Sequence, residues 1–397
     1  MGTGKQSERK QAAPSAQEVE GRRGGHTVRN VIAIIFGAAV ICLGAWSAAA
    51  IAESVANPTE VEQVELATIH EASEEGEASS SVAAGTTTVT VSVAGDCTLG
   101  TDEYFNYSTS FNAMYESVAD PSWFFENVYD IFSEDDLTIV NMEGTLTESA
   151  SRADKEYAFK GSAEYAQVLV EGGVEAASLA NNHSHDYGEE SYTDTIENLE
   201  AAGIATFGYD SIDYEEVNGV TVALIGTYEL ALGIGIEDEM VENIQTAEDE
   251  GADIIIVYIH WGSEREYVPD ETQIELGHAA IDAGADLVVG SHPHVIQGYE
   301  EYNGHYIVYS LGNFCFGGNS NPSDKDCMII QQTFVITDDG EVEVGELTVI
   351  PCSVSSTSSS NNYQPTPAEG DEAERILEKI QESCDAIAEL SAEVEAS

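Results

Sequence analysis

Residues 287–294 read Leu-Val-Val-Gly-Ser-His-Pro-His, so a short apolar run leads directly into a pair of histidines. Runs of this length and composition are typical of buried β-strands. Ligands of open α/β sheets bind just beyond the carboxyl ends of the strands, which is where His292 and His294 stand. Residues i and i+2 of an extended segment point the same way, so we expect both imidazoles to face one site.

Four other apolar runs also end in residues that bind metals or transfer protons. They are 89–94 before Asp96, 137–140 before Asn141 and Glu143, 176–180 before Asn182, His183 and Asp186, and 254–259 before His260. Helical patterns at about 163–172, 189–202, 241–249 and 271–283 alternate with the runs. This alternation predicts an α/β fold with helices covering a sheet. Later runs at 306–309, 329–336 and 341–349 have no long helices between them and predict a second, more antiparallel sheet.

The residue types at these strand ends suit a transition metal. The candidate ligands are the imidazoles of His260, His292 and His294, the carboxylates of Asp96 and Glu143, and the amides of Asn141 and Asn182. Such a mixture suits Zn, Mn or Fe better than Ca or Mg. Two such ions about 3.5–4 Å apart would clamp the attacking and leaving oxygens of a phosphoryl displacement.

Each cluster also has an ordinary structural explanation. Asp96 could cap a turn, and Asp186 could cap the helix that follows it. Asn141 and Asn182 could be turn residues, and a single histidine at a strand end is more often a surface residue than a ligand. Five such clusters in one chain nevertheless favour a shared metal or substrate site.

Six motifs, in this order and spacing, resemble the CapA family over about residues 88–352. They are GDCTLG (95–100), NMEGTL (141–146), LANNHSHDYG (179–188), IHWG (259–262), GSHPHVIQG (290–298) and SLGNF (310–314). The wider superfamily that they resemble is the calcineurin-like metallophosphoesterases, which implies a sandwich of two β-sheets flanked by helices. The resemblance also implies a role in capsule or poly-γ-glutamate synthesis, export or attachment.

The resemblance assigns roles to individual residues. Metal-ligand positions fall on Asp96, on Glu143 or Asn141 as the bridging ligand, on Asn182, and on His260, His292 and His294. His183 takes the position of the acid near the leaving group, and Asp186 could orient it. Thr98 stands where the superfamily pattern has a histidine, so the resemblance implies one ion or two.

Two functions fit these observations. In the first, the chain is a metal-dependent hydrolase or transferase that acts on a phosphoryl or amide centre of a surface polymer or its precursor. In the second, it is a non-catalytic accessory subunit of a membrane polymer synthase, which the altered first motif favours. The expected partners are the capsule polymer and synthase subunits. The 73 acidic residues against 13 basic ones argue against nucleic acid as a partner.

The N-terminal part of the chain predicts a membrane anchor. The run at 31–52 has 22 residues without a charge, enough for a helix that crosses the hydrocarbon core. Six of the 13 basic residues precede residue 31, so residues 1–30 are expected in the cytoplasm and the large domain outside the cell membrane. Small residues at 47–52 leave a cleaved signal peptide as the alternative.

The remaining chain divides by composition. Residues 53–87 are rich in Glu, Ala, Ser and Thr and indicate a solvated, acidic stalk. Residues 88–352 form the expected folded domain. Residues 353–397 begin with a Ser-rich linker and continue into a helical pattern near 368–394.

Five cysteines follow the apolar run, at positions 97, 315, 327, 352 and 384. Disulfides persist outside the cytoplasm, and an odd number leaves at least one thiol unpaired within the chain. Cys315 and Cys327 are close enough in sequence to close one loop. We hypothesise a disulfide between them.

Overall fold

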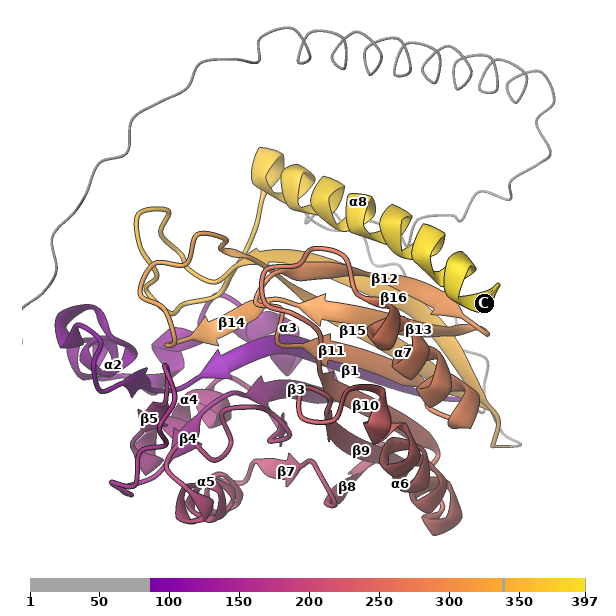
Figure 1. Ribbon diagram of the computed structural model, residues 1–397, viewed down its shortest axis with the longest axis horizontal. Coiled ribbons are helices and arrows are strands. Elements are labelled where there is room, and N and C mark those ends of the chain that lie inside the picture. The colour runs from indigo at the N-terminus through magenta and orange to yellow at the C-terminus, as the bar shows by residue number, and fades with distance from the viewer. Residues whose placement is uncertain (1–85, 338–339, 397) are drawn as a thin grey trace, which may run out of the picture. The chain divides into compact units, whose positions relative to one another are not determined.

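Two mixed β-sheets form the framework of the computed structural model, which describes residues 86–337 and 340–396 (Figure 1). The first sheet has the order β17-β16-β15-β1-β3-β6-β7, with β14 also paired to β1. Its strands are β1 (Thr87–Thr98), β3 (Leu137–Met142), β6 (Ala176–Ser178), β7 (Ala205–Phe207), β14 (Asn313–Phe316), β15 (Asp326–Ile336), β16 (Val342–Ser353) and β17 (Thr366–Pro367). The β1 strand is parallel to β3 and antiparallel to β15, so the direction of pairing changes at β1.

The second sheet has the order β12-β13-β11-β10-β9-β8. Its strands are β8 (Ile212–Val217), β9 (Val220–Tyr228), β10 (Ile254–His260), β11 (Leu287–Ser291), β12 (Ile296–Tyr302) and β13 (His305–Leu311). The four central strands are parallel, and both edge strands are antiparallel to their neighbours. A small third sheet joins β2 (Thr101–Asp102), β5 (Phe159–Gly161) and β4 (Thr145–Leu146).

The two large sheets share one apolar core. Val91 and Val93 of β1 lie in it together with Leu287 and Val289 of β11. In β10, residues 254, 256 and 258 belong to this core, whereas residues 255, 257 and 259 belong to a second core on the helix side. This division follows from the two-residue period of a strand, and a strand covered on both faces is apolar throughout.

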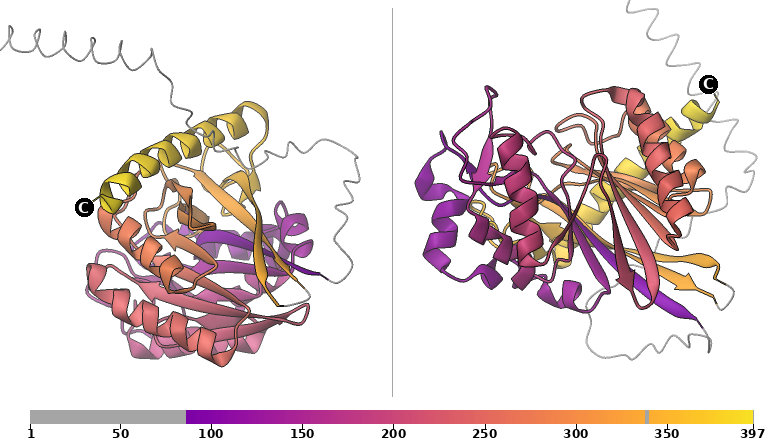
Figure 2. Two further views of the ribbon diagram at one scale, coloured as in Figure 1. Left: turned by 90° about the vertical axis from the view of Figure 1, so that its right-hand side faces the viewer. Right: turned by 90° about the horizontal axis from the view of Figure 1, so that it is seen from below.

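Helices cover the outer faces of the two sheets (Figure 2). They are α2 (Phe111–Val118), α3 (Tyr129–Ser133), α4 (Ala166–Glu171), α5 (Glu189–Ala202), α6 (Glu237–Glu250), α7 (Glu271–Ala283) and α8 (Gly370–Glu395), with 3₁₀ helices at Tyr107–Thr109, Pro121–Phe124, Ala163–Tyr165 and Gly233–Ile236. Residues of α2 to α5 form the apolar cluster on the first sheet, and residues of α6 and α7 form the cluster on the second. The predicted α/β architecture of sheets flanked by helices is therefore confirmed.

The expected grouping of the later strands is wrong. The β15 strand pairs with β1 from Thr87 to Val93, so β15 and β16 extend the first sheet and do not begin another. The β13 strand lies in the second sheet, parallel to β11. Local periodicity does not specify which distant strand supplies the hydrogen-bond partner, and the antiparallel pairs are therefore divided between two mixed sheets.

The hypothesised disulfide between Cys315 and Cys327 is also wrong, because both residues are free thiols. Cys315 lies in β14, where its Sγ donates to the carbonyl oxygen of Tyr363 at 3.3 Å. Cys327 lies in β15, directly opposite Cys352 of β16. The two thiols thus have different neighbours inside the apolar core.

The helix expected near 368–394 is α8, which lies against β12 (Figure 1). Ile376 and Ile380 join the core shared by the sheets, and Ile387 joins the core under α7. Gly298 of β12 permits the close approach, because a Cβ atom there would lie 2.7 Å from the backbone nitrogen of Cys384. The helix is therefore an integral layer of the fold.

Among the described residues, no helix is both long and apolar enough to cross a membrane. The apolar run at 31–52, the basic segment before it and all but the last two residues of the expected stalk lie outside the described residues. The expected anchor and its orientation therefore stay predictions.

Candidate metal centre

Residues from the strand ends of both sheets meet at one place. In the first sheet, Asp96 at the end of β1 is in register with Asn141 at the end of β3. In the second sheet, His260 ends β10, and its Nε2 lies 3.8 Å from Oε1 of Glu143, which follows β3. Ligand atoms of Glu143, His292 and His294 all lie within 4.8 Å of one another.

Glu143 is the centre of this cluster. Its carboxylate is fully buried, and neither oxygen has a hydrogen-bond partner among the described residues. Oε1 lies 3.9 Å from Nε2 of His183 and 3.8 Å from Nε2 of His294. Burial, and after it the charge of Asp96, raises the pKa of Glu143 well above its usual value. A buried carboxylate without a partner is costly unless a cation is bound to it.

A chain of amides holds the carboxylate of Asp96. Asn141 Nδ2 donates to Asp96 Oδ1 at 2.8 Å, and Asn181 Nδ2 donates to Asn141 Oδ1 at 3.1 Å. Asp96 Oδ2 has no geometrically regular hydrogen bond among the described residues and lies 3.2 Å from Nδ1 of His294. Gly95 brings the neighbouring loop close, because a Cβ atom there would lie 2.0 Å from the carbonyl oxygen of Gly312. Both ends of the Asn141 amide are engaged, so the geometry favours Glu143 over Asn141 for the bridging position.

His292 and His294 flank Pro293 in an unusual backbone conformation. Their φ angles are 97° and 56°, so this segment is not extended, contrary to the expectation from spacing. The imidazole rings nevertheless lie 5.7 Å apart, both near Glu143. Burial lowers the pKa of His292 to about 4. Burial opposes the charge of His294 as well, but Glu143 and Asp96 raise its pKa to about 9.

His260 and Asn182 contact each other directly. Asn182 Oδ1 lies 2.8 Å from His260 Nε2, and Ser291 Oγ lies 2.9 Å from His260 Nδ1. Burial, followed by the charge of His292, lowers the pKa of His260 well below its usual value. The imidazole is therefore neutral near pH 7, which is the form that binds a metal.

The donor set fits a transition-metal cation. Four atoms that could face such an ion are buried and lack hydrogen bonds within the described chain: both oxygens of Glu143, Oδ2 of Asp96 and Nδ1 of His292. Buried polar atoms normally have partners, so a group of four such exceptions fits the binding of a cation. Imidazole together with carboxylate suits Zn, Mn or Fe.

Comparison with known proteins identifies the family of the chain. The family model "Bacterial capsule synthesis protein PGA_cap" matches residues 90–318, which is more than half of the chain. The chain belongs to this capsule synthesis family. Within the family model's range lie all of the strand ends that form the candidate site.

Two named relatives show the extent of the likeness. The "PGA biosynthesis protein CapA" of Bacillus subtilis is 35% identical over 214 residues, which cover 48% of this chain and 56% of that protein. A "Probable polyglutamine synthesis accessory protein" of Mycobacterium tuberculosis is 26% identical over 211 residues, which cover 45% of this chain and 55% of that protein. The chain thus spans about half the length of the curated relatives that it matches.

Among solved structures, a 5'-nucleotidase from Candida albicans aligns with 75% of this chain and 57% of its own, at 9% identity and a TM-score of 0.37.

In this PGA_cap member, His183 lies beside the carboxylate cluster and is held by two charged residues. Its Nδ1 lies 2.6 Å from Asp186 Oδ2 and 3.2 Å from Lys155 Nζ. Lys155 also donates to Asp186 Oδ1 at 2.7 Å. Phe159 covers the imidazole, with ring centroids 4.4 Å apart. Burial lowers the pKa of His183, although Asp186 acts in the opposite direction.

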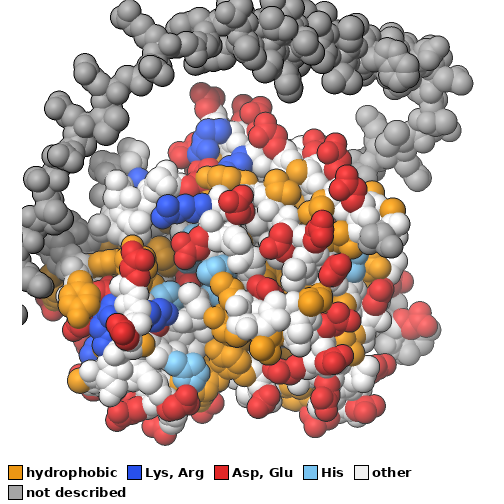
Figure 3. Space-filling view, in the orientation of Figure 1, with side chains coloured by type: hydrophobic (Ala, Val, Ile, Leu, Met, Phe, Trp, Pro, Cys, Tyr) orange, Lys and Arg blue, Asp and Glu red, His pale blue; other side chains and the backbone are white. Residues whose placement is uncertain are grey.

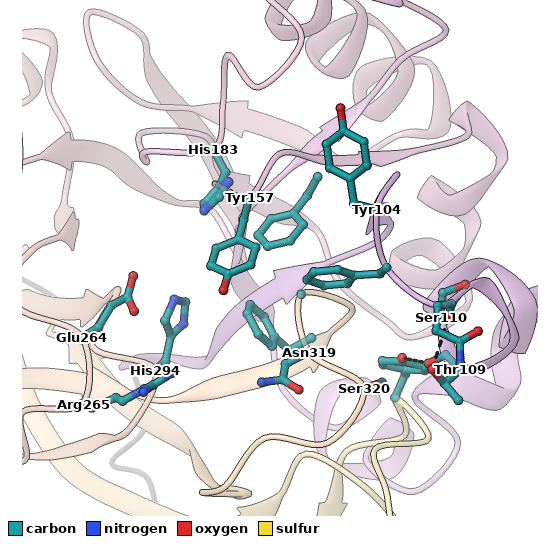
Figure 4. A pocket seen from close by; sticks show the side chains of 16 residues that line it. Tyr104, Thr109, Ser110, Tyr157, His183, Glu264, Arg265, His294, Asn319 and Ser320 are labelled. Carbon is teal, nitrogen blue, oxygen red and sulfur yellow. Dashed lines mark hydrogen bonds between the residues drawn. The ribbon is translucent and has the colours of Figure 1, made fainter. Parts of the chain in front are cut away.

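A cavity of about 490 Å³ adjoins these histidines (Figure 4). His183 and His294 line it where it meets the cluster, and Arg265 and Glu264 line it nearby. The remaining wall consists mainly of aromatic and small polar side chains. The cavity gives a reacting group access to the candidate centre.

Reasoning from sequence missed four residues that position the site. They are Lys155, Asn181, Ser291 and Asn313, which contact His183, Asn141, His260 and His294 respectively. The sequence could have drawn attention to Lys155, because only seven basic residues follow the N-terminal segment. The other three lie inside the motifs at 179–188, 290–298 and 310–314, but their residue types alone do not separate them from ordinary turn residues.

Proposed function

We propose that this chain acts in the synthesis, export or attachment of poly-γ-glutamate capsule polymer, as a metal-dependent hydrolase or transferase of the calcineurin-like type. The observation that carries the proposal is the buried carboxylate of Glu143, which has no hydrogen bond among the described residues and lies among the imidazoles of His183, His260 and His294. The names of the relatives support the polymer, and the fit of the donor set to a cation supports the chemistry.

The residues divide into two groups by what they contact. Glu143, Asp96, His292 and His294 would hold the ion, which supplies Lewis-acid activation of a reacting oxygen or carbonyl when bound. The hydrogen bond between Nδ1–H of His183 and Oδ2 of Asp186 leaves Nε2 as the atom that can exchange a proton with a reacting group. The packing of Phe159 against this ring excludes water from one side.

A non-catalytic accessory role is the second candidate. Thr98 stands at the position where the phosphoesterase pattern has a histidine, which removes one ligand from a two-metal site. The Mycobacterium relative carries the word accessory in its name. In this role the cleft would hold a chain end for a synthase partner without cleaving it.

Metal analysis separates the two candidates. The full-length chain, purified from membranes in detergent, is expected to retain about one or two transition-metal ions and to shorten or transfer γ-linked glutamyl chains. A chain that binds no transition metal and leaves such chains intact would establish the accessory role.

The variant Glu143→Gln supplies a second readout from the same preparation. It keeps the shape of the side chain and removes the buried charge, so metal content is expected to fall. After treatment with a chelator, the variant should melt at a higher temperature than the wild type, because the wild type then contains a buried carboxylate that has no hydrogen bond among the described residues. A lower melting temperature in the metal-free variant would contradict the role given to Glu143.

We also propose that residues 31–52 anchor the chain in the cell membrane with the large domain outside. The uncharged run and the basic residues before it support this orientation. Protease added to intact cells should remove the domain and spare the first 30 residues. Protection of the domain would contradict the orientation.

A further inference from the structure

Basic side chains are scarce in the described part of this acidic chain, and nearly all of them are engaged. Figure 3 shows acidic side chains spread over one face, with Lys and Arg in only a few places. Of the seven Lys and Arg residues between 86 and 396, six have a side chain that makes an ion pair or a hydrogen bond with a described residue: Arg152, Lys155, Lys160, Lys325, Arg375 and Lys379. The seventh, Arg265, makes no ion pair or side-chain hydrogen bond with any described residue.

Arg265 is fixed next to the candidate centre by its backbone. Its N–H donates to the carbonyl oxygen of Pro293 at 2.8 Å, between the two histidines of the site. Its φ angle is 66°, and the φ angles of His292 and His294 are also positive. Three of the eight described non-glycine residues with positive φ are therefore found at this one place. Such conformations persist where the surrounding structure enforces them, and they cluster at functional sites.

The guanidinium of Arg265 lines the same cavity as His183 and His294, close to His294 in Figure 4. Glu264 also lines the cavity but makes no ion pair with Arg265. A guanidinium without a partner, beside a centre that could activate a reacting group, is suited to hold an anionic part of the substrate.

Another wall of the cavity is aromatic. Phe105 packs edge-on against Tyr157 at 5.8 Å and against Phe159 at 6.4 Å. Tyr104 and Tyr157 stay 75% and 46% exposed although both are large aromatic residues. The cavity thus combines one free cation with an apolar surface that solvent can reach. A ligand that matches it has a carboxylate beside a stretch of methylene groups.

We infer that Arg265 determines specificity by binding the α-carboxylate of a γ-linked glutamyl substrate, while the aromatic wall packs against its methylene groups. This inference rests on the proposed function. A γ-amide linkage leaves an α-carboxylate next to every backbone amide, so an anion accompanies each bond that could react. Arginine binds such a group through two parallel hydrogen bonds. The local positive charge also offsets the repulsion that a chain with a net charge of −60 exerts on an anionic polymer.

The test compares two ligands on the full-length chain in detergent, loaded with metal. One ligand is a short γ-linked glutamyl oligomer, and the other is the same oligomer with its α-carboxylates converted to carboxamides. The wild type should bind the carboxylate form about 10- to 100-fold more tightly. Arg265→Ala should lose this preference while keeping the affinity for the carboxamide form, the metal content and the melting temperature. Arg265→Lys should keep part of the preference, because it retains charge without the paired donors.

Lys325→Ala is the matched control, since it removes one positive charge from a residue that does not line the cavity. It should bind both ligands as the wild type does. The inference is overturned if Arg265→Ala keeps the preference, or if the wild type binds the two oligomers equally or binds neither. Failure of the proposed function has a different signature, which is loss of metal binding and turnover in the wild type, whatever the ligand preference.

Discussion

His183 Nδ1 lies 2.6 Å from Asp186 Oδ2, and the Nε2 atom on the other side of the ring lies 3.9 Å from Glu143 Oε1. One carboxylate therefore orients the imidazole, and the other is the residue best placed to hold a cation. Within this cluster, His183 is thus the candidate for proton transfer and Glu143 is the candidate for metal binding. This division makes variants of His183 and of the ligands distinguishable.

We expect His183→Ala to keep near-normal metal content while turnover falls about 10²- to 10⁴-fold, as is typical when a general acid or base is removed. His292→Ala should lose metal and turnover together, because an imidazole ligand is lost. Metal content, rate and melting temperature are measured on both variants. Equal metal loss in the two would make His183 a ligand. A loss of stability alone in His183→Ala would make it a structural residue.

Lys155 should act through His183 and Asp186. Its ammonium lies 2.7 Å from Asp186 Oδ1 and 2.8 Å from the carbonyl oxygen of Asn182, so Lys155→Ala frees both groups. We expect turnover to fall by about tenfold or more, with metal content unchanged. Lys160→Ala serves as the control in the same segment, because Lys160 bonds to the carbonyl oxygen of Ser149 and not to the site. If Lys160→Ala lowered turnover as much as Lys155→Ala, the loss would come from a general disturbance of the segment that contains both residues.

The C-terminal helix should contribute to the stability of the whole domain. Ile376 is fully buried in the core shared by the sheets, so Ile376→Ala is expected to lower the free energy of unfolding by about 2–5 kcal/mol. Glu378→Ala, at an exposed position of the same helix, should change it by about 0.5 kcal/mol or less. Denaturant unfolding measures both. Similar small effects would mean that α8 is only loosely docked.

The buried thiols should resist alkylation in the native protein. Burial raises the pKa of Cys97 and of Cys352 to about 12, and only the thiolate reacts. Peptide mapping after brief alkylation should therefore find label on Cys384, which is partly exposed, before it appears on the other four described cysteines. All five should react after denaturation. A peptide pair linked through Cys315 and Cys327 would contradict the free thiols.

Asp286 should make stability depend on pH. Burial raises its pKa to about 6 in the folded chain, against 3.8 ordinarily. The folded state therefore binds this proton more tightly, and the resulting stability is present below about pH 4 and is lost as the pH rises through 6. Asp286→Asn should raise the melting temperature at pH 8 and lose this advantage at pH 4.

Asp253→Asn is the control for that measurement. Asp286 accepts a hydrogen bond from the backbone N–H of Ile255, and Asp253 accepts the equivalent bond from Thr221 at an exposed position. Both variants alter a carboxylate that accepts a hydrogen bond from a backbone N–H, but Asp286 is half-buried whereas Asp253 is exposed. The comparison therefore separates the effect of burial from the effect of the hydrogen bond. A gain for Asp286→Asn that is the same at both pH values would contradict the assigned cause.

The sequence by itself determined the α/β class and the strand ends that carry the chemistry. These features depend on local periodicity. Successive side chains of β10 point into two different cores, and the strand ends at His260. This pattern can be recognised without knowing which distant segments pack against the strand. The order of the motifs also indicated the family, and the family model matches residues 90–318, the range that contains all of the strand ends.

Only the tertiary structure decided which polar and charged side chains have hydrogen-bond or ion-pair partners and which do not. Within the part of the chain that the structure describes, the carboxylate of Glu143 has no hydrogen bond, and this depends on segments far apart in the chain. The positive φ angles of His292 and His294 and the contact of Lys155 with His183 depend on such segments as well. The same holds for Arg265, which has no side-chain partner within residues 86–337 and 340–396, a fact that its position in the sequence does not reveal. Periodicity describes the face on which a residue lies, whereas hydrogen bonding and charge pairing depend on which distant segments pack against that face.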